Sequence, residues 1–208
     1  MKLVGYYNYT VIATYIGLAA AVTGLALCFM GQPGWAVICL LVAGASDMVD
    51  GKIASTKKDR TKNERSYGIQ IDSLCDVISF SVLPAAIGLG YGITHWSYIA
   101  VSILFILAAV IRLGYYNVDE INRQNDPTSQ RREAYLGLPV TLSAVIAPVV
   151  CFANSWTAGF PIVYTVVLGL TAIAYIAPFR LPKPHGWGLV LLGAAGAAVV
   201  VGAALLLV

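Results

Sequence analysis

The stretch from Asp47 to Asp76 reads DMVDGKIASTKKDRTKNERSYGIQIDSLCD and contains two pairs of carboxylates at helical spacing. Asp50 follows Asp47 by three residues. Asp76 follows Asp72 by four residues. Because residues three or four apart share one face of a helix, each pair is expected to direct its two carboxylates at a common point. The stretch therefore predicts a helical hairpin whose two arms bring four carboxylates together.

Four converging carboxylates repel one another unless cations lie between them. Two divalent cations neutralise four carboxylates, so the pattern predicts a two-metal site formed by Asp47, Asp50, Asp72 and Asp76. A ligand set made only of oxygens favours Mg²⁺ or Mn²⁺ over Zn²⁺. The alternative is a solvated helix end, or ion pairs with nearby lysines. Against this alternative, the apolar run 77–89 follows at once, and charges at an apolar boundary are costly and usually functional.

Small residues accompany these carboxylates. Gly51 directly follows the first pair, and Gly68 lies one helical turn before Asp72, where the lack of a Cβ lets a ligand or a neighbouring helix approach the backbone. The pattern resembles the signature of the CDP-alcohol phosphotransferase family at seven positions, which are Asp47, Asp50, Gly51, Ala54, Gly68, Asp72 and Asp76. It departs at one position, because the family usually has Arg after Ala54 and this chain has Ser55.

The resemblance implies a membrane enzyme that transfers the phosphatidyl group of a CDP-linked lipid to a small alcohol and releases CMP. It implies that Asp47, Asp50 and Asp72 are metal ligands. It also implies that Asp76 is both a ligand of the second metal ion and the general base. These roles agree with the physical chemistry, because a two-metal centre can bridge a diphosphate and a neighbouring carboxylate can accept the proton of a hydroxyl.

The resemblance further implies a set of residues that bind the nucleotide of the CDP-lipid. This set contains Asp50, Gly51, Ala54 and Gly68. Because Ser55 replaces the arginine that contacts the diphosphate in the family, another cation is expected to take over this contact. The candidates are Lys52, Lys57 and Lys58, and we expect Lys58, three residues after Ser55, to make it.

Two later segments bear on the acceptor alcohol. They read IRLGYYN at 111–117 and YLGLP at 135–139, and both resemble the phosphatidylserine synthase branch of the family. This resemblance implies CDP-diacylglycerol as donor and L-serine as acceptor, with Arg112 binding the serine carboxylate or the phosphate and Asn117 supporting it. A guanidinium matches an oxyanion with two hydrogen bonds. The alternatives are a snorkelling anchor for Arg112, and glycerol 3-phosphate or an inositol phosphate as acceptor.

Composition predicts an all-α integral membrane protein. Of the 208 residues, 59% are hydrophobic and 11% are charged, which is more apolar surface than one soluble core of this size needs. Apolar runs long enough to cross a bilayer occur at 9–30, 34–56, 67–91, 96–117, 136–153, 160–178 and 187–208. They predict a bundle of about seven transmembrane helices, within a range of about six to eight. We expect one membrane-embedded domain over residues 1–208.

The basic residues predict the orientation of the bundle. They lie before the first span, around the second and third spans, between the fourth and fifth, and between the sixth and seventh. The connections at 31–34, 92–96 and 153–159 carry no Lys, Arg, Asp or Glu. By the positive-inside rule, the N-terminus and the aspartate site are expected to face the cytoplasm. We expect the membrane to be the cytoplasmic (inner) membrane of a prokaryote.

A divalent-cation transporter is the alternative of another class, because carboxylates within a membrane also mark ion pathways. A carrier site is expected near the midplane with polar groups on both sides of it, whereas these carboxylates cluster at one end of their spans. The sequence therefore favours the enzyme, with CDP-diacylglycerol, L-serine and membrane lipids as partners and no nucleic acid.

Small residues within the apolar spans are expected to serve helix packing. In the first span, close packing is favoured over nucleotide contact for the small and hydroxyl residues, which are Thr10, Thr14, Gly17, Thr23 and Gly24. In the last span, Gly188, Gly193, Gly196 and Gly202 suggest close packing, and we expect a homodimer.

Overall fold

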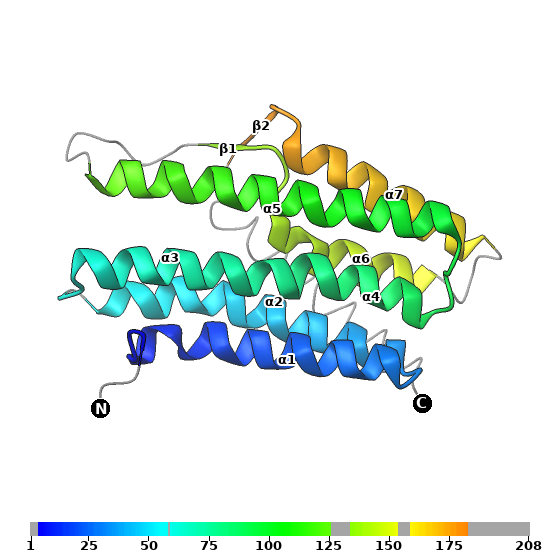
Figure 1. Cartoon of the computed structure of the whole chain (residues 1–208), viewed down its shortest axis with the longest axis horizontal. Coiled ribbons are helices and arrows are strands. Elements are labelled where there is room, and N and C mark those ends of the chain that lie inside the picture. Colours follow the sequence, from blue (N-terminus) through cyan, green and yellow to red (C-terminus); the bar gives the residue numbers. More distant parts are fainter. Residues whose placement is uncertain (1–3, 58, 126–133, 154–158, 183–208) are drawn as a thin grey trace.

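The computed structural model describes residues 4–57, 59–125, 134–153 and 159–182, which form long helices and a short ribbon (Figure 1). The first half contains η1 (Tyr9–Val11), α1 (Ile12–Phe29), α2 (Pro33–Thr56), α3 (Lys62–Val77), η2 (Ile78–Val82) and α4 (Leu83–Gly90). The second half contains α5 (Trp96–Asn125), β1 (Ala134–Leu136), η3 (Val140–Leu142), α6 (Ser143–Ala153), α7 (Phe160–Ile176) and β2 (Arg180–Pro182).

The long helices run along one common axis and alternate in direction (Figure 1). Helix α1 packs along α2, and α5 packs along α7, while α3 contacts α5 and α2 contacts α6. Their shared core contains large buried side chains from several helices, including Leu40, Phe80, Ile87, Phe105 and Tyr164. This arrangement places the α2–α3 connection, the start of α1 and the end of α5 at one end of the bundle.

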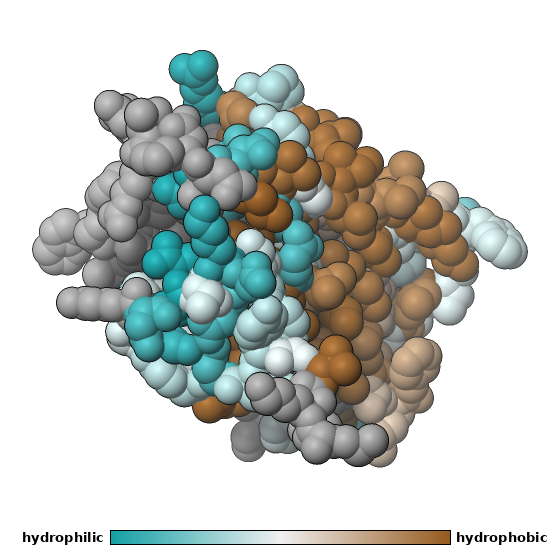
Figure 2. All heavy atoms as spheres, turned by 60° about the vertical axis from the view of Figure 1, so that its left-hand side comes forward, coloured by the Kyte–Doolittle hydropathy of each residue, from teal (hydrophilic) through white to brown (hydrophobic). Residues whose placement is uncertain are grey.

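Hydrophobic surface covers the sides of the bundle. Figure 2 shows hydrophilic side chains gathered at the end that comes forward, with a broad hydrophobic surface along the helices behind it. Among the described residues, three helical segments are long and apolar enough to cross a membrane, at Tyr9–Phe29, Lys62–Gly90 and Trp96–Arg123, and two shorter apolar helices lie at Val140–Phe152 and Phe160–Ile176. The fold is therefore predominantly helical and consistent with an integral membrane protein. The predicted span at 187–208 lies outside the described residues.

Two predicted helix ends differ from the structure. Helix α3 begins at Lys62 instead of residue 67, because Thr61 and Glu64 form a capping box in which the Thr61 side chain accepts from the Glu64 N–H and the Glu64 carboxylate accepts from the Thr61 N–H. Helix α5 continues to Asn125 instead of ending at residue 117. Both helices thus extend beyond their apolar runs into charged sequence.

The predicted helix at 136–153 is wrong in its first part. Strand β1 pairs antiparallel with β2, with Leu136 opposite Arg180. Gly137 then takes a φ of 67°, a left-handed conformation that a side chain disfavours, and α6 begins only at Ser143. The chain of 134–139 is therefore an extended segment and a turn, and the single 3-10 turn η3 leads from it into α6.

The segments α3, η2 and α4 form one continuous helical path, in which η2 is a π-helical turn and Pro84 lies in the first turn of α4. Proline has no N–H, so the carbonyl of Phe80 lacks its usual helical donor. The hydroxyl of Ser143 donates to that carbonyl over 2.6 Å. Tyr164 donates to the carbonyl of Pro84 over 2.8 Å, and Tyr98 donates to that of Ala85 over 2.6 Å. Side chains of α5, α6 and α7 thus stabilise the helix that continues from the aspartate site.

Candidate metal centre

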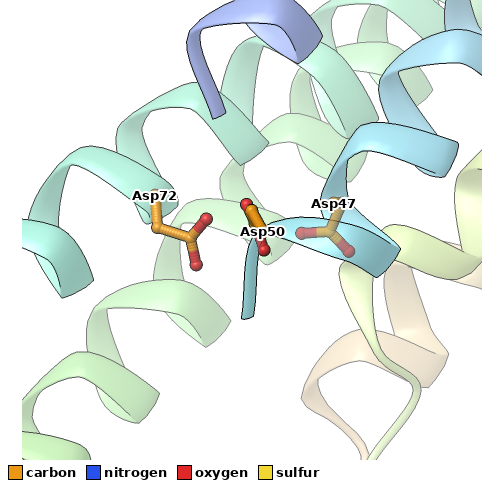
Figure 3. A group of neighbouring side chains, drawn as sticks. All are labelled: Asp47, Asp50 and Asp72. Atoms are coloured by element: carbon orange, nitrogen blue, oxygen red, sulfur yellow. The ribbon is translucent and has the colours of Figure 1, made fainter. Parts of the chain in front are cut away.

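Helices α2 and α3 bring three carboxylates together. Asp47 and Asp50 lie near the end of α2, and Asp72 lies on α3. One oxygen from each carboxylate lies within 4.8 Å of the corresponding oxygens of the other two. Figure 3 shows Asp47 and Asp72 pointing toward Asp50, which lies between them. The structure therefore places three of the four predicted metal ligands around one point.

This aspartate triad, defined as Asp47, Asp50 and Asp72, fits a hard divalent cation. Its donors are all carboxylate oxygens, the ligand type that Mg²⁺ and Mn²⁺ prefer. Magnesium binds oxygen at about 2.1 Å, so two ligands on opposite sides of the ion lie about 4.2 Å apart. The spacing within 4.8 Å suits this requirement after small side-chain adjustments.

Asp76 faces the same space but stands apart from the triad. It lies one turn beyond Asp72 on α3 and is not part of the group of oxygens within 4.8 Å. It lines a small recess together with Thr14, Gly17, Ala43, Ser46, Asp47, Asp50, Cys75, Ser79 and Phe80. Its carboxylate is thus directed to the interior side of the site, where it adjoins Asp47 and Asp50.

A threonine of α1 completes the surroundings of Asp50. The Thr14 hydroxyl donates to Oδ2 of Asp50 over 3.2 Å, and both side chains are buried. The sequence suggested only helix packing for Thr14. Its neighbour Gly17 does serve close packing, because a Cβ there would lie 3.3 Å from Ser46 of α2. A hydroxyl in an apolar span was the available signal, but spacing within one helix does not indicate which side chain of another helix it meets.

The predicted nucleotide-side residues lie along the two arms. Gly51 is exposed, and a Cβ added to it would meet no described atom within 4 Å. Ala54 is half-buried on α2. At Gly68 an added Cβ would come within 2.5 Å of Nη2 of Arg60. Open space therefore adjoins Gly51, whereas the guanidinium of Arg60 occupies the space beside Gly68.

The three lysines considered as substitutes for an arginine at position 55 have different surroundings. Lys52 is exposed, and its backbone carbonyl accepts from the Ser55 hydroxyl over 2.6 Å. Lys57 forms an ion pair of 2.8 Å with Glu64, and this hydrogen bond raises the pKa of Lys57. Lys58 lies outside the described residues.

The two acceptor segments contact each other. Arg112 is buried, and its Nη1 donates to the carbonyls of Leu136 and Tyr175 over 2.5 and 2.9 Å. Its Nη2 donates to the carbonyl of Gly137 over 3.3 Å. Its guanidinium carbon also lies 4.7 Å from the ring centroid of Tyr116. Arg112 thus connects α5 to the turn at Gly137 and to the end of α7.

Asn117 lies beside α3, the helix that carries Asp72. Its side-chain oxygen accepts a hydrogen bond of 2.7 Å from Ser73, the residue after Asp72. Asn117 of α5 is therefore hydrogen-bonded to α3 at the residue next to Asp72, whereas Arg112 donates to carbonyls of β1, of α7 and of the turn between β1 and η3.

Several known proteins are similar to this chain over most of its length. The chain is 28% identical over 148 residues to a CDP-diacylglycerol–serine O-phosphatidyltransferase of Saccharomyces cerevisiae, covering 68% of this chain and 52% of the relative. It is 26% identical over 181 residues to the protein of that name from Mycobacterium tuberculosis, covering 83% and 60%. It is 28% identical over 162 residues to an archaetidylserine synthase of Methanothermobacter thermautotrophicus, covering 76% and 62%.

The matched region accounts for 52% of the length of the yeast relative and 60% of that of the Mycobacterium tuberculosis relative. Residues 8–177 match the CDP-alcohol phosphatidyltransferase family. This range includes α1 to α7, and therefore the aspartate triad, Asp76 and both acceptor segments. The chain belongs to the CDP-alcohol phosphatidyltransferase family.

Proposed function

We propose that this protein transfers the phosphatidyl group of CDP-diacylglycerol to the hydroxyl of L-serine, giving phosphatidylserine and CMP. The observation that carries the proposal is the aspartate triad at the junction of α2 and α3, within a chain of this family. The serine acceptor is supported by the names of the relatives, which include CDP-diacylglycerol–serine O-phosphatidyltransferases and an archaetidylserine synthase.

Asp47, Asp50 and Asp72 would hold one divalent cation, and Asp76 with its neighbours in the recess would complete a site for a second. Mg²⁺ or Mn²⁺ in these positions would neutralise the diphosphate and stabilise the charge that develops on the departing CMP. Gly51, Ala54 and Gly68 would form the nucleotide side, with Lys58 as a proposed phosphate contact.

The chain itself supplies the proton acceptor. Asp76 would accept the proton of the serine hydroxyl while the serine oxygen forms a bond to phosphorus. The bond from phosphorus to the CMP oxygen breaks, and its electron pair leaves with CMP. Thr14 keeps the Asp50 carboxylate in place through its hydrogen bond of 3.2 Å. The groups of the proposed site therefore come from the three packed helices α1, α2 and α3.

The acceptor side would involve the two contacting segments. We propose that Asn117 supports the serine, because Ser73 holds it beside the helix that carries Asp72. Arg112 is proposed to bind the serine carboxylate or the transferring phosphate. Arg112 also has a structural role in this proposal, because its hydrogen bonds to the carbonyls of Leu136, Gly137 and Tyr175 hold β1 and the turn at Gly137 against α5 and α7.

The active site is proposed to face the cytoplasm from the inner membrane of a prokaryote, with a homodimer as the assembled form. The orientation is supported by the hydrophilic end of the bundle, where α2 ends and α3 begins (Figure 2). Carboxylates gathered toward this end suit an enzyme that meets a water-soluble acceptor, rather than a carrier whose site lies at the midplane.

One assay tests the proposal. The purified protein is incubated with CDP-diacylglycerol, Mg²⁺ or Mn²⁺ and either L-serine, glycerol 3-phosphate or an inositol phosphate, and CMP release is measured. We expect CMP release with serine and formation of phosphatidylserine. Release with another acceptor alone would overturn the choice of serine. No release with any acceptor, from a protein that is folded and binds the metal, would overturn the proposed activity.

A further inference from the structure

We propose that Arg60 is a phosphate-binding residue of this site and that its ligand is the diphosphate of a CDP-linked lipid, a proposal that rests on the function proposed above. Arg60 precedes the N-cap residue Thr61 of α3. Its Nη2 donates to the backbone carbonyl of Glu64 over 3.3 Å. The side chain therefore runs forward along α3, toward the aspartate triad, instead of leaving the helix for solvent.

The absence of a side chain at Gly68 allows this path. A Cβ added there would lie 2.5 Å from Nη2 and 3.8 Å from the guanidinium carbon of Arg60. The guanidinium thus occupies the position that a side chain of residue 68 would fill. Residues 68 and 72 share one helix face and are about 6 Å apart along the axis. Arg60 therefore presents a positive charge about one turn from Asp72, on the same face.

Among the described residues, no carboxylate pairs with the Arg60 guanidinium. Its Nε is buried and has no hydrogen-bond partner within the described part of the chain. The ion pairs of the described residues join Lys57 to Glu64 and Arg123 to Glu120, and none includes Arg60. A partly buried charge without a partner is costly, and an arriving oxyanion would remove that cost.

Phosphate is the oxyanion that fits this place. A guanidinium can donate two parallel hydrogen bonds to two phosphate oxygens, which the ammonium group of a lysine cannot do. Arg60 contacts the backbone of Glu64, whose carboxylate is already paired with Lys57. Arg60 is left as a guanidinium beside the triad, where the proposed reaction places a diphosphate.

The test measures binding of CDP to the purified protein in a neutral detergent with Mg²⁺, by calorimetry, alongside the Michaelis constants for CDP-diacylglycerol and serine. CDP carries the diphosphate without a lipid, so a contact with membrane phosphate does not contribute. We expect Arg60→Ala to weaken CDP binding about tenfold, the scale of one charge-assisted hydrogen bond. The Michaelis constant for CDP-diacylglycerol should rise similarly and that for serine should not.

Arg65→Ala is the matched control, because Arg65 is exposed on the same helix and its side chain makes no hydrogen bond or ion pair with the described residues. It should bind CDP like the wild type. Ser55→Arg should be tolerated, and added to Arg60→Ala it should restore CDP binding, because the new guanidinium lies at the adjacent end of α2. If Arg60→Ala does not fold, Arg60→Lys is the second variant. Lysine keeps the charge but cannot donate two parallel hydrogen bonds to phosphate, so CDP binding should still weaken several-fold.

Unchanged CDP affinity in a folded Arg60→Ala variant would overturn the proposal, including the case in which only its binding to vesicles of anionic lipid changes. Weaker binding in Lys58→Ala together with normal binding in Arg60→Ala would assign the contact to Lys58 instead. A wild-type protein that neither binds CDP nor releases CMP would count against the proposed function itself, so the two failures are distinguishable.

Discussion

The hydroxyl of Thr14 on α1 donates a hydrogen bond of 3.2 Å to the Asp50 carboxylate on α2. Thr14→Val has nearly the same shape but cannot donate, so Asp50 would lose an orienting contact in a buried place. We expect turnover to fall by roughly five- to tenfold, the scale of one hydrogen bond to a charged group. CMP release at saturating substrates measures this effect.

Thr23→Val is the control for Thr14, because the Thr23 hydroxyl is on the same helix and bonds only its own backbone, at Ala19. It should leave turnover unchanged. Thr14→Ser should retain most of the activity, since it keeps the donor. Equal losses in the valine variants of both threonines would show that the effect comes from helix packing and not from Asp50.

Asp72→Asn tests the triad as a cation site. It removes one negative charge from a group whose oxygens lie within 4.8 Å of one another, with little change in volume. We expect Mn²⁺ binding, measured by electron paramagnetic resonance, to weaken more than tenfold, with loss of CMP release. Asp59→Asn, an exposed aspartate before α3, is the control and should bind Mn²⁺ normally. Normal Mn²⁺ binding by Asp72→Asn would contradict the triad as a metal site.

Asp76→Asn is expected to abolish transfer while leaving the protein folded. Asp76 lines the recess beside Asp47 and Asp50 but stands outside the triad, so its proposed role as base is distinct from theirs. CMP release should fall at least a hundredfold at saturating Mg²⁺ or Mn²⁺, the scale of general-base catalysis. Retention of more than roughly a tenth of the wild-type turnover would remove Asp76 from the role of base.

Arg112→Lys tests the acceptor side. Lysine keeps the charge but lacks the planar fork that serves the carbonyls of Leu136, Gly137 and Tyr175. We expect the serine requirement to rise much more than the CDP-diacylglycerol requirement, and the thermal midpoint in detergent to fall. A uniform fall of turnover with every acceptor would instead assign Arg112 to the phosphate. A lower thermal midpoint with unchanged kinetics would leave Arg112 only its structural contacts.

Ser143→Ala tests the contact that compensates for Pro84. Without the hydroxyl, the buried carbonyl of Phe80 loses its donor, which costs about 1 to 3 kcal/mol. We expect a lower thermal midpoint in detergent. Ser97→Ala is the control, because Ser97 is exposed and its hydroxyl contacts only His95 nearby. If both variants unfold at the wild-type temperature, the Ser143 contact does not stabilise the helix.

The sequence by itself determined the features that depend on local periodicity. Apolar runs mark most of the helices because a helix exposed to lipid must be apolar along its length. The spacing of Asp47 with Asp50 places both on one face of α2, and the short connection before α3 brings Asp72 to the same end. Carboxylates close to each other in a hairpin follow from helix geometry alone.

The tertiary structure decided the contacts between elements that lie far apart in the chain. Thr14 meets Asp50, and Arg112 meets the carbonyl of Tyr175, because of the relative rotation and axial position of packed helices. Spacing within one helix does not determine these quantities, since several rotations can bury the same apolar face. The Arg60 side chain likewise lies along α3 and reaches Gly68, a contact that periodicity within the helix does not predict because Arg60 precedes the helix.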